Sequence, residues 1–321
     1  MLRVVGRKKR VQQAVVLAVA TAMVGACGAR TGLLAPEETD GSLPDVHHDV
    51  AHEPDVDAAE EDAVPPIDVV VVDVPIPTDC PDAGSTLVYV IGAGNELYSF
   101  YPPTLGFKQI GVVSCTNQSS PFSMAVNRLG TAYSVFSNGD LFQISTANAA
   151  CKPTKYAPSQ LGWTTFGMGY ATAPDGGDSL FVVQVDFQNP SQGLGTIDTT
   201  TFKLDEVGAF QPDLTPECEL TGTGDGRLFA LCLSNGSPDG TLAQIDQQTA
   251  KVVGEDTLPG LGGGQQALAF AFWGGDFWIF TAPGNTTTVS KYDPVTKKLT
   301  TETTLAAQIV GAGVSTCAPQ Q

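Results

Sequence analysis

The feature that most constrains the fold is a motif that repeats five times in the C-terminal three quarters of the chain. Each copy is a short run of residues that ends in an apolar anchor, followed by a turn and then, in most copies, by Thr. Three copies have Asp at the start of the turn; Asp and Thr side chains hydrogen-bond to nearby backbone groups and so stabilise turns. The anchors lie 44, 53, 48 and 47 residues apart and are Phe100, Ile144, Ile197, Ile245 and Tyr292.

A second apolar run lies upstream of each anchor, and glycine-rich turns precede several of these runs. Each repeat therefore has room for about four short strands separated by turns. No convincing amphipathic helix is present, and the 35 Gly and 22 Pro among 321 residues disfavour a helical bundle. The chain is predicted to be all-β. The second runs are 87–90, 132–135, 180–183, 228–231 and 277–280.

A four-stranded repeat of this length and turn chemistry resembles the blade of a β-propeller. The resemblance covers 84–321 and is to the architecture alone, because neither a Trp-Asp blade ending nor a double-glycine kelch signature recurs. It implies a ring of five four-stranded blades. A β-sandwich, an irregular barrel and a six-bladed ring are the alternatives. The strands expected to line the channel are 122–126, 166–170, 218–222, 267–271 and 309–315.

The two ends of the repeat region predict how the ring closes. The first repeat lacks an innermost strand, and the apolar residues 309–315 have the pattern of that strand with nothing after them. Pairing the C-terminal strand into the first blade would remove an open sheet edge.

The cysteines agree with this closure. Apart from Cys27, six cysteines remain, and an exported chain allows them to form disulfides. Cys80 precedes the first strand and Cys317 follows the closing strand, so these two are expected to pair. Cys218 and Cys232 flank a hairpin centred near residue 225 and are expected to pair across it. Elimination leaves Cys115 and Cys151 as the third pair.

The N-terminal residues resemble a bacterial lipoprotein signal. Five basic residues precede the apolar stretch 14–26, which is too short to span a bilayer but suits a secretory signal. The quartet Val24, Gly25, Ala26, Cys27 resembles a lipobox, which implies cleavage after residue 26 and diacylation of Cys27. Gly28 favours the outer membrane, because Asp is the typical inner-membrane retention signal there. The first residues after Cys27 also look like the mature start of many myxobacterial lipoproteins. An ordinary signal peptide is the alternative.

The segment 27–83 is predicted to be a disordered tether. From residue 34 it contains 15 acidic residues, eight prolines and no Lys or Arg, so charge repulsion and proline disfavour regular pairing. His47, His48 and His52 lie here beside acidic residues, where a polar tether explains them better than a metal site. By formal charge, residues 34–83 carry −15, the folded domain 84–321 carries −9, and the mature chain, which also includes Arg30, carries −23.

Several function classes are excluded by the residue types present. Nucleic acid is not an expected partner of so acidic a chain. The folded domain contains no His, which excludes Ser-His-Asp and Cys-His catalysis, and no phosphate or dinucleotide motif stands in its proper context. No cofactor and no metal site are predicted.

The function predicted from the sequence is binding without catalysis, by a propeller anchored to the membrane through lipid and presented to an envelope protein or a glycan. Trp163 and Trp273 are candidate binding residues, although packing between blades is the commoner use of such rings. Glu217 and Glu219 are the least turn-like acidic pair, and one of them is expected to face the channel. They make a polysaccharide hydrolase with a carboxylate pair the alternative. A structural envelope protein without a ligand is a third.

Overall fold

This computed structural model describes residues 64–67, 80, 86–115, 118–185, 193–215, 217–234 and 236–321. All of them belong to one compact unit, Ala59–Gln321. The signal sequence, Cys27, the three histidines and most of the tether lie outside the described residues. No helix in the described part of the chain is long and apolar enough to cross a membrane.

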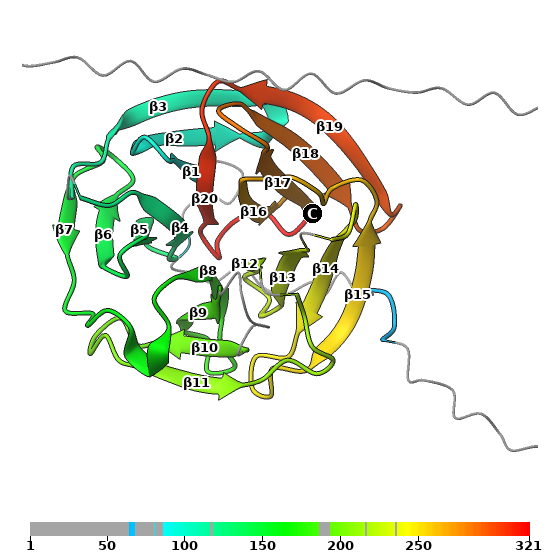
Figure 1. The fold of residues 1–321 in the computed structure, drawn as a ribbon, viewed down its shortest axis with the longest axis horizontal. Helices are drawn as coiled ribbons and strands as arrows, with labels where there is room; N and C mark the ends of the chain where they lie inside the picture. The colour runs from blue at the N-terminus through cyan, green and yellow to red at the C-terminus, as the bar shows by residue number, and fades with distance from the viewer. Residues whose placement is uncertain are drawn as a thin grey trace, which may run out of the picture. The chain divides into compact units, whose positions relative to one another are not determined.

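The described residues form five four-stranded antiparallel sheets arranged in a ring, which is a five-bladed β-propeller (Figure 1). The prediction of five blades is confirmed. The only helices among the described residues are the 3₁₀ turns η2 (Pro102–Thr104) and η3 (Gln160–Gly162).

Each blade runs from an inner strand at the channel to an outer strand at the rim. Blade 1 is β20 (Ile309–Val314), β1 (Val88–Gly92), β2 (Glu96–Tyr101) and β3 (Gly106–Val112). Blade 2 is β4 (Pro121–Val126), β5 (Thr131–Phe136), β6 (Leu141–Ser145) and β7 (Cys151–Pro153). Blade 3 is β8 (Phe166–Thr172), β9 (Asp178–Gln184), β10 (Leu194–Ile197) and β11 (Leu204–Gly208). Blade 4 is β12 (Glu217–Gly222), β13 (Leu228–Leu233), β14 (Gly240–Ile245) and β15 (Val252–Leu258). Blade 5 is β16 (Ala267–Trp273), β17 (Asp276–Ala282), β18 (Thr287–Asp293) and β19 (Lys298–Leu305).

The ring closes as the sequence predicts, because blade 1 is assembled from both ends of the domain. The C-terminal strand β20 pairs antiparallel with β1, and Val88 lies opposite Val314. The three disulfides are also those predicted: Cys80–Cys317, Cys115–Cys151 and Cys218–Cys232. Such a set is typical of proteins exported to an oxidising compartment.

The core is divided among the five interfaces between neighbouring blades. Strand side chains alternate between two faces, so each blade contributes to two interfaces. On β13, Leu228 and Ala230 pack toward blade 3, whereas Phe229 and Leu231 pack toward blade 5. Every adjacent pair of blades has its own buried apolar cluster.

Glycines allow the inner strands to lie close together around the channel. A Cβ on Gly167 would lie 2.2 Å from the Cys218 carbonyl oxygen, and one on Gly169 would lie 2.8 Å from the Leu220 backbone. Gly311 and Gly313 of β20 approach the backbone of β4 in the same way. Larger side chains at these positions would push the inner strands apart.

The repeated motif forms the turn between the third and fourth strand of each blade. Asp246 Oδ1 accepts hydrogen bonds from the backbone N–H groups of Gln248 and Thr249, and Asp293 binds the equivalent turn of blade 5. These bonds to the carboxylate lower the pKa of both Asp residues, with the hydroxyl of the turn Thr contributing most. Each turn also contains one non-glycine residue with positive φ, a feature that the sequence did not reveal. These residues are Leu105, Ala149, Phe202, Ala250 and Lys297.

Candidate functional site: the two mouths of the channel

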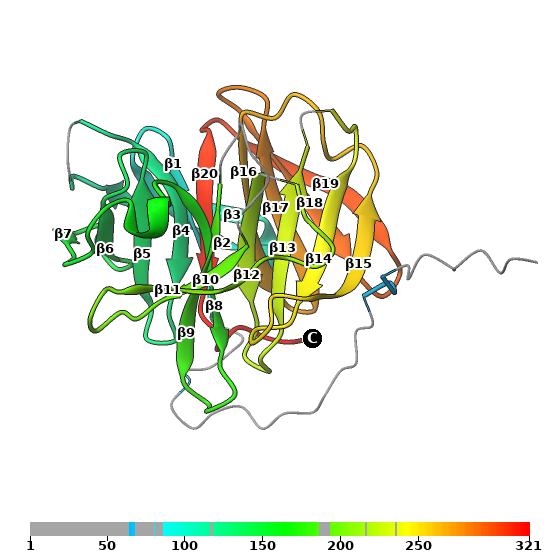
Figure 2. The same cartoon turned by 60° about the horizontal axis from the view of Figure 1, so that its bottom comes forward.

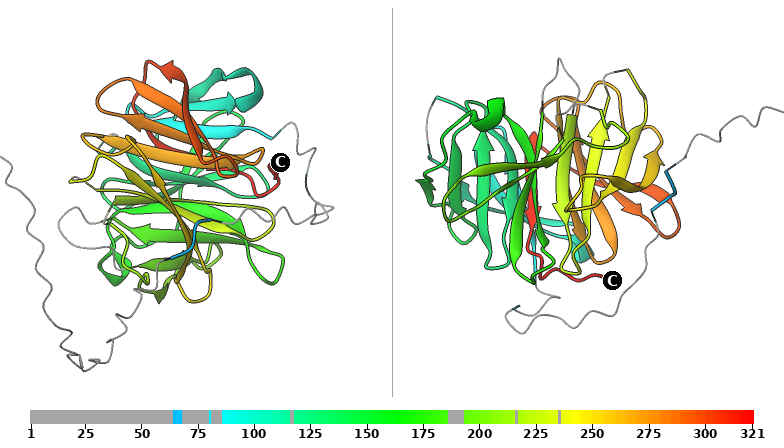
Figure 3. Two further views of the ribbon diagram at one scale, coloured as in Figure 1. Left: turned by 90° about the vertical axis from the view of Figure 1, so that its right-hand side faces the viewer. Right: turned by 90° about the horizontal axis from the view of Figure 1, so that it is seen from below.

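The inner strands all begin at one mouth of the channel and end at the other, so the ring has two distinct faces. We call the face where the inner strands end the tail face, because the C-terminal residues 315–321 follow β20 there. Figures 2 and 3 show this C-terminal stretch crossing the ends of the inner strands. The face where the inner strands begin is called the open face.

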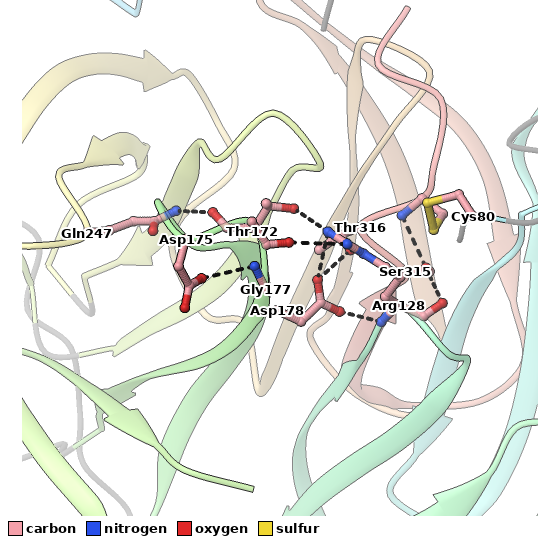
Figure 4. A network of polar contacts seen from close by, with 11 residues as sticks. Cys80, Arg128, Thr172, Asp175, Gly177, Asp178, Gln247, Ser315 and Thr316 are labelled. Atoms are coloured by element: carbon pink, nitrogen blue, oxygen red, sulfur yellow. Dashed lines mark hydrogen bonds and ion pairs between the residues drawn. A yellow bond between two sulfur atoms is a disulfide. The ribbon is translucent and has the colours of Figure 1, made fainter. Parts of the chain in front are cut away.

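A polar network closes the mouth on the tail face (Figure 4). Arg128 lies in the turn after β4 and Asp178 begins β9; their side chains form an ion pair at 3.3 Å and are only 11% and 13% exposed. Thr316 of the C-terminal stretch donates its hydroxyl to Asp178 at 2.8 Å and accepts a hydrogen bond from Arg128. Arg128 also binds Thr172 at the end of β8. One arginine therefore joins blades 2 and 3 to the C-terminal stretch.

The C-terminal stretch also contacts the turns of blades 4 and 5. A Cβ on Gly224 would lie 2.2 Å from the Thr316 carbonyl oxygen, so glycine is required at this approach. The Gly274 N–H donates to the Pro319 carbonyl at 2.8 Å. The Cys80–Cys317 disulfide fixes the middle of the stretch. Covalent, polar and backbone contacts together thus hold the C-terminal stretch on the tail face.

The mouth on the open face contains a cavity of about 80 Å³. Glu217 and Glu219 of β12 both line it, together with apolar residues of β4, β16 and β20. The sequence analysis expected one of the two to face the channel. Both do, because side chains two residues apart on a strand lie on the same side.

The Glu219 side chain extends from blade 4 across the channel to blade 2. Its Oε2 accepts a hydrogen bond of 2.6 Å from the Ser123 hydroxyl of β4, and that hydroxyl accepts the Met168 N–H of β8. Gly167 and Gly169 of β8 have no side chains to obstruct this path. The carboxyl group thus connects three inner strands.

Burial sets the proton affinity of this carboxyl pair. Desolvation raises the pKa of Glu219 well above its ordinary value, although the hydrogen bonds from Ser123 and Met168 oppose the shift. Burial also raises the pKa of Glu217, which is less enclosed. The negative charge of Glu217 adds to the shift at Glu219. Both groups therefore bind a proton more readily than a carboxyl in water.

The two candidate tryptophans occupy different places. Trp163 is 1% exposed and packs in the cluster between blades 2 and 3, so its ring offers no surface for stacking on a sugar. Trp273 lies at the end of β16 on the tail face, partly exposed, where its Nε1 donates to the Thr86 carbonyl at 2.7 Å. Its ring meets Tyr101 edge to face. Neither tryptophan lies among the residues that line the cavity of Glu217 and Glu219.

The tail face also has two depressions that the sequence analysis missed. One, of about 590 Å³, lies at the turns of blades 3 and 4 and is lined by Gln248 and Val253 among others. The second, of about 480 Å³, lies on blade 2 and is bordered by Leu129. Leu129 and Val253 are 82% and 45% exposed. The apolar residue Leu129 at a predicted turn was the one sign of these depressions in the sequence.

Among the described residues, no three His, Cys, Asp or Glu side chains lie close enough together to hold a metal ion. Asp175, in the turn before β9, uses its carboxylate to accept the Gly177 N–H at 2.9 Å.

No family model matches the chain, and no curated protein is significantly similar to it. Solved structures that it resembles include a nidogen/laminin complex, at 16% identity over 76% of this chain and 83% of that one, with a TM-score of 0.42. Hydrazine synthase of Kuenenia stuttgartiensis is 17% identical over 73% of this chain and 68% of that one, with a TM-score of 0.40. TolB from Acinetobacter baumannii is 11% identical over 72% and 56%, with a TM-score of 0.41.

These likenesses are too distant to carry an argument about function, and the assignment of the fold rests on the chain's own strand order. By that order the protein is a five-bladed β-propeller, and a disulfide and polar contacts hold its C-terminal stretch on the tail face.

Proposed function

We propose that the protein is an exported binding module that presents the tail face of its propeller to a partner protein. The observation that carries the proposal is the pair of depressions on that face, of about 590 and 480 Å³. Ligand pockets are typically about 300–1,000 Å³. Exposed Leu129 and Val253 at their borders favour a protein partner over a glycan, because aliphatic side chains contribute more to protein interfaces than to binding sugar hydroxyls.

The rigid mouth supports this role. Arg128, Asp178 and Thr316 join the turns around the channel, so the loops of the tail face are held in a fixed arrangement. A surface that is already ordered loses less conformational entropy when it binds.

The membrane anchor belongs to the same proposal. Diacylation of Cys27 would hold the ring at the outer membrane, and the acidic segment that follows would space the ring from the lipid surface. A Cys27→Ser variant is then expected to fractionate as a soluble protein. Unchanged membrane fractionation would argue against lipidation.

Hydrolysis of a polysaccharide is the competing function, and the shared position of Glu217 and Glu219 at one mouth is the observation in its favour. Two features oppose it. The cavity of about 80 Å³ is much smaller than typical ligand pockets, and the Glu219 carboxyl is buried against Ser123 rather than held open to a substrate. Release of sugar from a polysaccharide panel by the wild type, and its loss in Glu217→Gln, would overturn the binding proposal.

The proposal is tested by photo-crosslinking in the native envelope. A photoreactive amino acid replaces Leu129 on the tail face; the matched control replaces Leu161, which is 54% exposed in η3 on the open face. We expect a discrete protein adduct from position 129 and none from position 161. An adduct from position 161 alone would place the partner on the wrong face. No protein adduct from either position, with binding on a glycan array, would make the ligand a glycan.

A further inference from the structure

A short part of the acidic segment lies against the rim of blade 4. Val64, Pro65, Pro66 and Ile67 are described, whereas the sequence analysis expected the whole of 27–83 to be disordered. Ile67 is 3% exposed and belongs to the apolar cluster between blades 4 and 5. Val64 packs against the cluster between blades 3 and 4. These four residues, which we call the strap, therefore cross the outer edge of blade 4 from one blade interface to the next.

The edge of β15 provides hydrogen-bond donors for the strap backbone. The Glu255 N–H donates to the Pro65 carbonyl at 2.8 Å, and Lys297 Nζ donates to the Ile67 carbonyl at 2.9 Å. Gly254 lies beneath Ile67, where a Cβ would come within 3.1 Å of the Ile67 Cα. The site thus combines two donors, an apolar seat and a glycine that makes room for the backbone.

Lys297 is held in place for this contact by residues of two blades. Its Nζ lies 2.9 Å from Asp256 Oδ2, and Asp256, which is 7% exposed, also accepts the Tyr292 hydroxyl at 2.9 Å. Lys297 occupies the positive-φ position of the blade 5 turn. The repeated turn of blade 5 therefore positions the Lys297 ammonium group toward the rim of blade 4.

We propose that the rim of blade 4 is a recognition site for an extended apolar-Pro-Pro-apolar segment, and that its occupant is the strap of the same chain. The proposal is independent of any partner on the tail face. Pro65 and Pro66 have no N–H, so these two residues cover part of the β15 edge without offering donors for a further strand. The tether of a lipidated chain would then leave the ring at blade 4 and span 28–63 rather than 28–83.

The strap also makes a closed segment of the residues between it and the disulfide. Ile67 is fixed on blade 4 and Cys80 is fixed to Cys317, so 68–79 has two anchored ends. Removing the strap would leave only the Cys80 end anchored. Cleavage within 68–79 therefore reports whether the strap is bound.

The test compares Ile67→Asp with a matched control, Ile76→Asp, in the full chain. Both changes put the same charge beside proline in the same acidic segment, and Ile67 is the one that the structure describes in the apolar seat. For Ile67→Asp we expect hydrogen exchange at the Glu255 amide to quicken at least ~10-fold, because that amide loses its acceptor. Cleavage between Val69 and Val72 by thermolysin, which cuts beside bulky apolar residues and gains no site from either substitution, should quicken as well. The control should match the wild type in both.

A milder variant, Ile67→Ala, keeps the test informative where the charged change disturbs folding, and is expected to shift both readouts in the same direction. Unchanged exchange and cleavage in both Ile67 variants would overturn the proposal. A wild-type dimer in gel filtration that becomes a monomer in Ile67→Asp would also overturn it, since the strap would then bind a second copy.

Discussion

The two mouths of the channel are built from the same five inner strands but hold their charges differently. On the tail face, Arg128 and Asp178 neutralise each other, Thr316 donates to the same Asp178 oxygen, Oδ1, and the Arg128 backbone N–H donates to Oδ2. On the open face, Glu217 and Glu219 share one small cavity without a basic partner in its lining, and burial raises the pKa of both. The comparison indicates that the tail face stabilises the ring at neutral pH, whereas the carboxyl pair of the open face opposes that stability.

Removing the disulfide of each face is expected to give the largest effects. Cys80→Ser with Cys317→Ser opens a closure with a sequence separation of 237 residues, and Cys218→Ser with Cys232→Ser opens one of 14. The chain-entropy model predicts losses of about 5 and about 3 kcal/mol in the free energy of unfolding. Denaturant unfolding of the two double variants measures both. A larger loss of unfolding free energy from removing the hairpin disulfide would contradict the expectation that the tail face contributes more to stability than the open face.

Breaking the ion pair on the tail face comes next. Arg128→Ala leaves the Asp178 carboxylate nearly buried without its cation, which is expected to cost about 3 kcal/mol of unfolding free energy. The control is Lys203→Ala, whose ion pair with Asp205 is 68% and 58% exposed and should contribute less than about 1 kcal/mol. Equal effects of the two substitutions in thermal unfolding would show that Arg128 does not hold the mouth closed.

Neutralising the buried Glu219 carboxyl on the open face should increase the free energy of unfolding, whereas Arg128→Ala decreases it. A folded-state pKa above the unfolded one gives stability that is present below the ordinary carboxyl pKa and is lost as the pH rises through the folded-state pKa. Glu219→Gln removes this loss, so the variant should be more stable than the wild type at pH 8 and differ little from it at pH 4. Urea unfolding at the two pH values measures the difference. A variant less stable than the wild type at pH 8 would mean that the ionised carboxylate is favourable there.

The smallest expected effect lies in the repeated turn, away from both mouths. Asp246→Ala removes a carboxylate that binds two backbone N–H groups at an exposed turn, and should cost about 1 kcal/mol. The lowered pKa of Asp246 means that this contribution is present at neutral pH and is lost on acidification through the folded-state pKa. Thermal unfolding at pH 7 and pH 3 should show a smaller gap between variant and wild type at the lower pH.

Much of the ring was predictable from the sequence because its determinants are local and repeated. The anchors from Phe100 to Tyr292 and the closing strand β20 follow from short-range patterns, and the disulfide partners follow from the strand arrangement that those patterns predict and from elimination. The closure of the tail face did not, since Arg128 and Thr316 are 188 positions apart and neither belongs to a motif.

The strap and the contact of Glu219 with blade 2 were not predicted, for different reasons. Val64 to Ile67 lie in a segment whose charge and proline content favour disorder, and only the apolar seat beside β15 orders them. The position of Glu219 depends on Gly167 and Gly169 in another blade, which no local pattern connects to it. Contacts between different parts of the ring determine both the position of the strap and that of the Glu219 side chain.

The central claim is that the C-terminal strand is an integral part of the ring, locked at the tail face. Hydrogen exchange of the native protein tests it most directly, because amides that open only by global unfolding exchange most slowly. We expect peptides covering β20 to be protected as strongly as those covering β12, the inner strand that bears Glu219. Exchange of β20 that is ~100-fold faster than that of β12 would mean that blade 1 opens on its own, and would contradict the claim.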